Sequence, residues 1–418
     1  MARRSTGIAA IILLTILGLG CGNTFRPIAT PIPEPAGDPS NLHHAIVVND
    51  NALARGSASN IDTTGDTNIG NVVAGVNPVH AGFVSNSRTY LANTGDNTVT
   101  RYLTLSPASG TVTIPMPAGC VPSYVFSRNN GTAYVACPGN STVAVMNVSL
   151  DSITTTVPLA SAPTNLNETL GGTKVYAISN GGGTVSVIHT VDNAVTNTIA
   201  VGGAPTWSDL NQNGSLLFVA NAAGYVSVID TTTDALAAAP TFPFNTIAVG
   251  ANPTFVAFDT NRQRLYVVNS GSGTVSVIDC VSTSPNFLTV IATIPVGSNP
   301  TSVAPLRNGT KAYVSNQGSN TVSVIDATSN TVMVTIPTGT SPIWLTAPSD
   351  STRVIVGVQG SGGGTNFADP PSILSISTQS DTIIVTLKPP QQDPLCSPAS
   401  QPNQYCNLQQ PVFVTMAP

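Results

Sequence analysis

Charged residues are scarce in this 418-residue chain: lysine, arginine, aspartate and glutamate make up 8% of it, against about 25% in ordinary soluble proteins. The net charge of −5 and the lack of basic runs argue against a chain that binds nucleic acid. Hydrophobic residues nevertheless reach 41%, which argues against disorder. Glycine and proline are frequent, with 36 and 33 copies, and this composition of tight turns and short strands predicts an all-β fold.

Familiar catalytic and cofactor motifs are also missing. The sequence has no G-x-S-x-G nucleophile elbow, no H-E-x-x-H zinc motif and no C-x-x-C-H haem-attachment motif. Only four histidines occur, and the pair His43–His44 is expected to be solvated rather than to bind a metal. No cofactor is predicted. Aspartates that end repeated segments, Asp230, Asp279 and Asp326, are interpreted as turn-forming carboxylates.

Internal repeats dominate what is present. The stretch YVSNQGSNTVSVID at 313–326 recurs as YVVNSGSGTVSVID at 266–279 and as YAISNGGGTVSVIH at 176–189. The aligned copies are anchored, 41 to 48 residues apart, at Ile46, Tyr90, Tyr134, Tyr176, Phe218, Tyr266, Tyr313 and Val354. Each copy reads as four short strands, the first entered through a proline. Four-stranded sheets bury both faces when they stack in a ring, so this period predicts a β-propeller.

Eight copies predict eight blades, although the copy at Ile46 lacks the proline-led first strand. The segment PVFVTMAP at 411–418 has that missing pattern, and we expect it to close the ring as the innermost strand of the first blade. The alternative is seven blades, with residues 46–75 as an irregular flap. The repeats occupy 44–388, and 389–410 are expected to form an irregular connection.

The motifs YVSN and YVVN, followed by TVSVID and then by IPVG and a proline, resemble the YVTN β-propeller repeat family. The resemblance covers about residues 44–388. This family includes bacterial periplasmic and surface proteins and archaeal surface-layer proteins, and its members are commonly seven-bladed. The resemblance implies a propeller that lies outside the cytoplasm.

The N-terminus resembles the signal peptide of a bacterial lipoprotein. A basic start precedes the apolar run Gly7–Gly20, which is too short to span a bilayer, and LGLGC at 17–21 resembles a lipobox. We expect 1–20 to be removed, Cys21 to be lipidated, and 21–43 to form a proline-rich tether. An ordinary secretory signal is the alternative. The lipid anchor implies a protein of the bacterial cell envelope outside the cytoplasm, in the periplasm or on the cell surface, with the membrane as a partner. We also expect the protein to be a monomer.

Six cysteines in an exported protein favour disulfides. Cys120 and Cys137 flank a predicted hairpin and are expected to pair across it. Cys396 and Cys406 are expected to form a bridge within the irregular connection. Cys280 is left over as a small buried apolar residue.

A candidate ligand-binding site is built from one position of the repeat, two places after the strand-entering proline. Six of the eight copies have an aromatic residue or histidine there, although aromatic residues are 5% of the chain. These candidates are His80, Tyr124, Trp207, Phe255, Trp344 and Phe413, with Asn165 and Ser302 in the other copies. We interpret them as aromatic platforms around the channel mouth that stack on sugar rings or other flat apolar groups. The alternative is that they wedge between neighbouring blades as core.

The acidic residues are spread thinly, and no cluster departs from the repeat as a catalytic set would. The sequence therefore predicts a non-catalytic binding or scaffold propeller, with a glycan, peptide or protein partner, and not an enzyme. Two alternatives stay open. One is a structural cell-envelope protein, and the other is a propeller hydrolase of lactonase type or a dehydrogenase.

Overall fold

The computed structural model describes residues 43–51, 55–83, 88–127, 131–238, 242–361, 369–390 and 409–416. All of them belong to one compact unit, Ser40–Pro418. The predicted signal peptide, the lipidated Cys21 and the Cys396–Cys406 bridge lie outside the described residues. Within those residues, no helix has the length and apolar character needed to cross a membrane.

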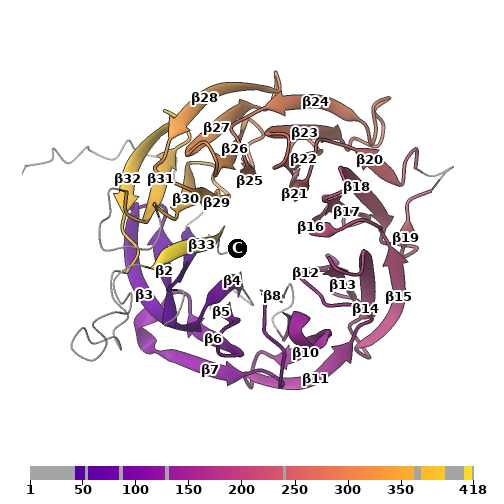
Figure 1. Cartoon of the computed structure of the whole chain (residues 1–418), viewed down its shortest axis with the longest axis vertical. Helices are drawn as coiled ribbons and strands as arrows, with labels where there is room; N and C mark the ends of the chain where they lie inside the picture. The colour runs from indigo at the N-terminus through magenta and orange to yellow at the C-terminus, as the bar shows by residue number, and fades with distance from the viewer. Residues whose placement is uncertain are drawn as a thin grey trace, which may run out of the picture. The chain divides into compact units, whose positions relative to one another are not determined.

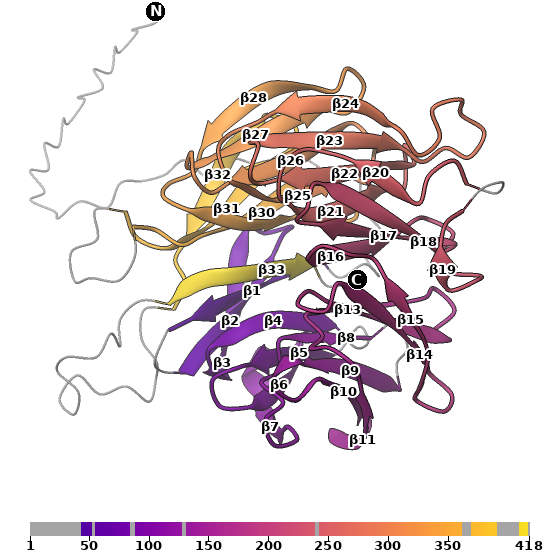
Figure 2. The same cartoon turned by 45° about the vertical axis from the view of Figure 1, so that its right-hand side comes forward.

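Eight antiparallel sheets surround a central channel as the blades of a β-propeller (Figures 1 and 2). The innermost strands are β33 (Gln410–Met416), β4 (Pro78–Phe83), β8 (Tyr124–Phe126), β12 (Asn165–Glu168), β16 (Pro205–Leu210), β21 (Pro253–Asp259), β25 (Pro300–Pro305) and β29 (Pro342–Thr346). The second strands are β1 (His44–Asp50), β5 (Arg88–Asn93), β9 (Thr132–Cys137), β13 (Lys174–Ser179), β17 (Leu216–Asn221), β22 (Arg264–Asn269), β26 (Lys311–Asn316) and β30 (Arg353–Val358).

The outer half of each blade follows the same order. The third strands are β2 (Arg55–Asp62), β6 (Thr98–Leu103), β10 (Thr142–Asn147), β14 (Thr184–His189), β18 (Tyr225–Asp230), β23 (Thr274–Asp279), β27 (Thr321–Asp326) and β31 (Ser372–Ser377). The fourth strands are β3 (Thr67–Val76), β7 (Thr111–Pro115), β11 (Ser152–Pro158), β15 (Ala194–Ala200), β24 (Val290–Pro295), β28 (Thr331–Pro337) and β32 (Thr382–Leu387). In the fifth blade the outer strand is split into β19 (Ala235–Leu236) and β20 (Thr246–Ala248), which both pair with β18. Two short 3-10 helices, η1 (Pro107–Ser109) and η2 (Pro138–Asn140), lie in loops.

The C-terminal strand closes the ring, as predicted. β33 pairs antiparallel with β1 and places Val414 opposite Val47, so the first blade is built from both ends of the repeat region (Figure 2). The residues that the seven-blade alternative assigned to an irregular flap form the regular strands β1, β2 and β3. The prediction of eight blades is confirmed, and the seven-blade alternative is wrong.

The hydrophobic core lies between adjacent blades. Second and third strands are buried on both faces because each sheet is covered by the next one, and in β26 and β27 the side chains of Tyr313, Val314, Val322 and Val324 are fully buried. In the fourth strands, the side chains either alternate between partly buried and exposed or are mostly exposed, as in β15. This gradient explains the valine-rich TVSVID segments and the threonine-rich segments that follow them.

The repeated tyrosine of the second strand ties neighbouring blades together. Tyr176 donates a 2.6 Å hydrogen bond to Asp234 Oδ1 in the next blade, and Lys174 Nζ lies 2.7 Å from Asp234 Oδ2. Burial and the bond to Asp234 raise the pKa of Tyr176 above its usual range, so the phenol remains a donor. Asp234 has a φ of 52°, in the left-handed region that aspartate and asparagine tolerate. The contact recurs as Tyr90 with Asp151 at 2.7 Å and Tyr313 with Asp381 at 2.5 Å.

The predicted turn role of the repeated aspartates is confirmed. Asp230 Oδ1 accepts a hydrogen bond from the backbone N–H of Thr232 at 2.8 Å. Asp326 Oδ1 accepts one from Thr328 at 2.7 Å. Such bonds fix the turn that leads into the outer strand.

One predicted disulfide falls within the described residues and is present. Cys120 and Cys137 are bonded, with Cα atoms 4.3 Å apart, and they join the loop before β8 to the end of β9. Cys280 is a buried free thiol, as expected.

Candidate active site

The first strands line the central channel, and a recurring bulge aims their side chains into it. In five blades the pairing register shifts between the entering proline and the residue two places later. In β16 the shift separates Pro205 from Trp207, and in β29 it separates Pro342 from Trp344. Proline lacks the N–H needed to begin a regular ladder, and a bulge re-aims the following side chain. Both tryptophans line the cavity described below.

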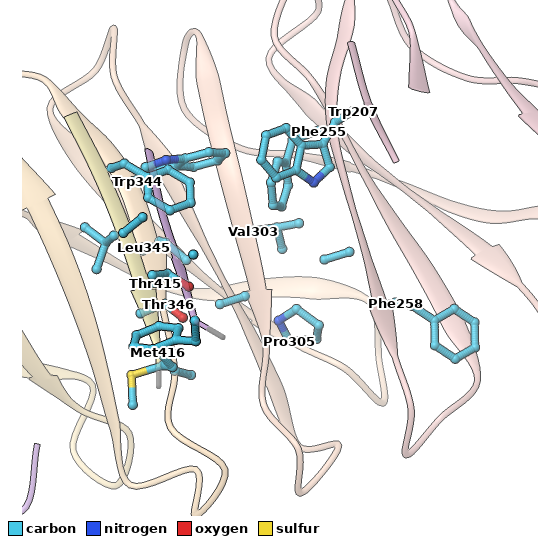
Figure 3. A pocket seen from close by; sticks show the side chains of 18 of the residues that line it. Trp207, Phe255, Phe258, Val303, Pro305, Trp344, Leu345, Thr346, Thr415 and Met416 are labelled. Atoms are coloured by element: carbon cyan, nitrogen blue, oxygen red, sulfur yellow. The ribbon is translucent and has the colours of Figure 1, made fainter. Parts of the chain in front are cut away.

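Trp207 is the centre of an aromatic cluster. Its ring centroid lies 5.0 Å from that of Phe255, 5.3 Å from that of Trp344 and 5.8 Å from that of Tyr124. Trp344 and Phe255 are in turn 4.9 Å apart. Figure 3 shows Trp207, Phe255 and Trp344 together at one end of the cavity.

Phe413, from the closing strand, completes the cluster. Its ring centroid lies 5.2 Å from that of Trp344 and 4.3 Å from that of His80, and His80 lies 3.8 Å from Tyr124. The structure therefore brings all six predicted side chains into one continuous group.

Asn165 and Ser302, at the two remaining positions, join neighbouring first strands instead. Ser302 Oγ accepts a 3.1 Å hydrogen bond from the backbone N–H of Leu345, and Asn165 Oδ1 accepts one from Ser208 Oγ at 3.1 Å. These bonds hold the channel wall in place.

The two tryptophans do not simply wedge between neighbouring blades. Trp207 belongs to the fifth blade and Trp344 to the eighth, so their edge-to-face contact crosses the channel. Both side chains are half-buried, because they pack on the blade core on one side and line the cavity on the other.

The cavity has a volume of about 570 Å³, within the usual range for small-molecule sites of roughly 300–1,000 Å³. The aromatic cluster forms the end where the first strands begin. The opposite end is formed where these strands finish, by residues that include Pro305, Thr346 and Met416 (Figure 3).

Two charged side chains line the cavity at the ends of their strands. Asp259 is the last residue of β21 and is buried; its Oδ1 accepts backbone hydrogen bonds from Asn261 at 2.9 Å and Arg262 at 3.0 Å. Its Oδ2 has no hydrogen-bond partner among the described residues. Arg307 follows β25 and is exposed. A carboxylate and a guanidinium group therefore border one cavity.

His80 adds a neutral polar group among the aromatic rings. Its Nδ1 accepts a 3.3 Å hydrogen bond from the backbone N–H of Val125, which assigns the proton to Nε2. Burial lowers the pKa of His80 from 6.5 to about 3, so the imidazole is uncharged at neutral pH.

Sequence reasoning missed Asp259 and Arg307. Both stand in hairpin turns, where acidic and polar residues are ordinary, and they are far apart in the chain. Their position just after a first strand is the signal that could have identified them. Across the described ranges, no group of three histidine, cysteine, aspartate or glutamate residues is placed to hold a metal. His43 instead lies 3.2 Å from Asp350.

Comparison with known proteins found a matching family model and several similar solved structures. A family model described as lactonase, 7-bladed beta-propeller, matches residues 241–338. That segment contains β21 and β25, which lead into Asp259 and Arg307. No curated protein matches the sequence. The chain is a β-propeller, with one blade more than that model describes.

Three similar solved structures carry enzyme names, and each is 14% identical in sequence. Dihydro-heme d1 dehydrogenase NirN, in complex with DHE, has a TM-score of 0.67 over 86% of this chain and 76% of that one. A putative 6-phosphogluconolactonase from Bacteroides fragilis has a TM-score of 0.55 over 81% and 96%. Hydrazine synthase from Kuenenia stuttgartiensis has a TM-score of 0.55 over 72% and 96%. At this identity the likeness shows the fold.

These findings overturn the prediction of a non-catalytic binding or scaffold module. The lactonase family model favours the enzymatic alternative, so the expectation that the protein is not an enzyme is corrected. The error has a physical reason. Catalytic residues were expected as a local departure from the repeat, whereas this cavity is assembled from the first strands of several blades that are far apart in the sequence.

Proposed function

We propose that the protein is a hydrolase that opens cyclic esters in the central cavity. The observation that carries this proposal is the position of the lactonase match. It covers the sixth and seventh blades, whose first strands lead into the carboxylate of Asp259 and the guanidinium group of Arg307. These two groups come from neighbouring blades, and the packing of β21 beside β25 brings them to one cavity.

The proposed chemistry uses this pair with one water molecule. Asp259 accepts a proton from water as the water oxygen attacks the ester carbonyl, and Arg307 stabilises the negative charge that develops on the carbonyl oxygen. The bond from the acyl carbon to the ring oxygen then breaks. The ring oxygen takes up a proton, and the product is a hydroxy acid.

Hydrolysis of a lactone panel by the purified protein, followed as acid release, tests the proposal. Asp259→Asn should lower the rate by about 10²–10⁴-fold, the usual contribution of a general base. Asparagine retains the oxygen that accepts the two turn hydrogen bonds, so the fold should persist. Asp326→Asn is the matched control, because Asp326 makes the same kind of turn after β27. Equal rates for the two variants, or no hydrolysis by the wild type, would refute the proposal.

We also propose that Cys21 anchors the protein to a membrane outside the cytoplasm and that its repeats are of the YVTN type. The LGLGC motif supports the anchor, and the Cys120–Cys137 disulfide suits an oxidising compartment. Detergent phase partitioning tests the anchor. The wild type should enter the detergent phase and Cys21→Ser the aqueous phase, and identical partitioning would exclude lipidation.

A further inference from the structure

The charged side chains and the aromatic cluster lie at opposite ends of the cavity. Among the residues that line it, the charged side chains are Asp259 and Arg307, both at the ends of their strands. The opposite end consists of the aromatic cluster, in which His80 is neutral because burial lowers its pKa to about 3. A ligand that fills the cavity would therefore meet an uncharged aromatic surface at one end and a charged pair at the other.

The other basic side chains are mostly committed to joining blades. Lys174 and Lys311 contact Asp234 and Asp381 in the following blades, each at 2.7 Å. Arg353 contacts Asp66 across the ring closure at 3.0 Å. A phosphate group at the aromatic end would find no cation among the residues that line the cavity there. This argues against a phosphorylated sugar lactone of the kind named for the Bacteroides relative.

From this separation we infer that the substrate is an uncharged, hydrophobic cyclic ester with an aromatic or alkyl-substituted ring. The apolar part stacks on Trp207, Phe255 and Trp344, whose rings lie 4.9 to 5.3 Å apart. The ester group then lies toward Asp259 and Arg307. The assignment of the ester rests on the proposed function, whereas the apolar ring rests on the aromatic cluster alone.

Intrinsic tryptophan fluorescence tests the ring preference without any need for turnover. The two tryptophans of the chain are Trp207 and Trp344, so the signal comes from this site alone. The probes are dihydrocoumarin, an uncharged aromatic lactone, chroman, which has the same ring system without the carbonyl, and glucose 6-phosphate. Dihydrocoumarin and chroman should change the emission with affinities at least tenfold higher than that of glucose 6-phosphate.

Two variants make the test specific. Trp344→Ala keeps Trp207 as the reporter and should weaken chroman binding at least tenfold, and Trp344→Leu should do the same if the alanine variant does not fold. Phe244→Ala is the control, because Phe244 is 47% exposed and does not line the cavity.

The possible results separate this inference from the proposed function. Tighter binding of glucose 6-phosphate, or no response to either ring compound, overturns the inferred substrate class. Binding of chroman and dihydrocoumarin without hydrolysis of any lactone of the panel supports the hydrophobic site and refutes the hydrolase.

Discussion

Trp207 and Trp344 meet edge to face across the central cavity, with ring centroids 5.3 Å apart and ring planes at 73°. They come from blades that are not neighbours, so this contact exists only when the ring is closed. The same two side chains therefore hold non-neighbouring blades together and shape the wall of the candidate active site.

A double-mutant cycle should measure this contact. Trp207→Ala and Trp344→Ala together should destabilise the protein less than the sum of the single changes, by about 0.5–1.5 kcal/mol, the usual worth of an aromatic pair. Urea unfolding followed by circular dichroism gives the three free energies. Strict additivity would mean that the rings do not interact in solution.

His80 should make stability depend on pH. Burial lowers its folded-state pKa from 6.5 to about 3, so between these values the unfolded chain binds a proton that the folded chain does not. The contribution of His80 to the free energy of unfolding is therefore fully present above pH 6.5. It falls by about 1.4 kcal/mol per pH unit as the pH drops toward 3. His80→Phe removes the titration and suits a site lined by aromatic rings. Its unfolding free energy should fall less steeply than that of the wild type between pH 6 and pH 4, and parallel curves would show that His80 titrates normally.

The stability of the protein should depend on the aspartate carboxylate that the tyrosine of the preceding blade contacts. Asp234→Ala leaves Tyr176 and Lys174 without their partner and places alanine at a positive φ, so we expect a loss of about 2–4 kcal/mol. Asp234→Asn keeps a hydrogen-bond acceptor, and asparagine tolerates the positive φ at this position. The loss of stability should therefore be about half as large. Asp192→Ala is the control, since its ion pair with His189 is exposed. Equal effects at positions 192 and 234 would contradict a structural role for the contact.

Removal of the closing strand should open the ring. Deletion of 411–418 exposes the edge of β1 and removes the buried Phe413 and Val414, with a loss of about 3–6 kcal/mol from their apolar surface alone. Differential scanning calorimetry should show a much lower Tm. An unchanged Tm would mean that the strand is not part of the stable ring.

The disulfide of the third blade should stabilise the wall that contains Tyr124. Replacement of Cys120 and Cys137 by serine should cost about 3 kcal/mol, the value for a loop of this length. A reducing agent should lower the Tm of the wild type but not that of the double variant. Cys280→Ala, which removes a free thiol, should retain the response to reduction.

The fold could be predicted from the sequence because the sequence repeats. The period, the proline before each first strand and the missing first strand at Ile46 were enough to predict eight blades and closure by 411–418, because strand pairing depends mainly on local pattern. The same repeat position identified the six aromatic and histidine residues that the structure brings together.

The candidate active site depended on tertiary structure. In the sequence, Asp259 and Arg307 look like other turn residues, and only their position at or just after the end of a first strand distinguishes them from Asp230 and Asp326, which end third strands. Their relation appears only when the first strands of the sixth and seventh blades pack side by side and line the same cavity. The sequence by itself determined the blades and the aromatic positions. The packing of neighbouring blades determined which charged groups share a cavity, because residues far apart in the chain meet there only when β21 lies beside β25.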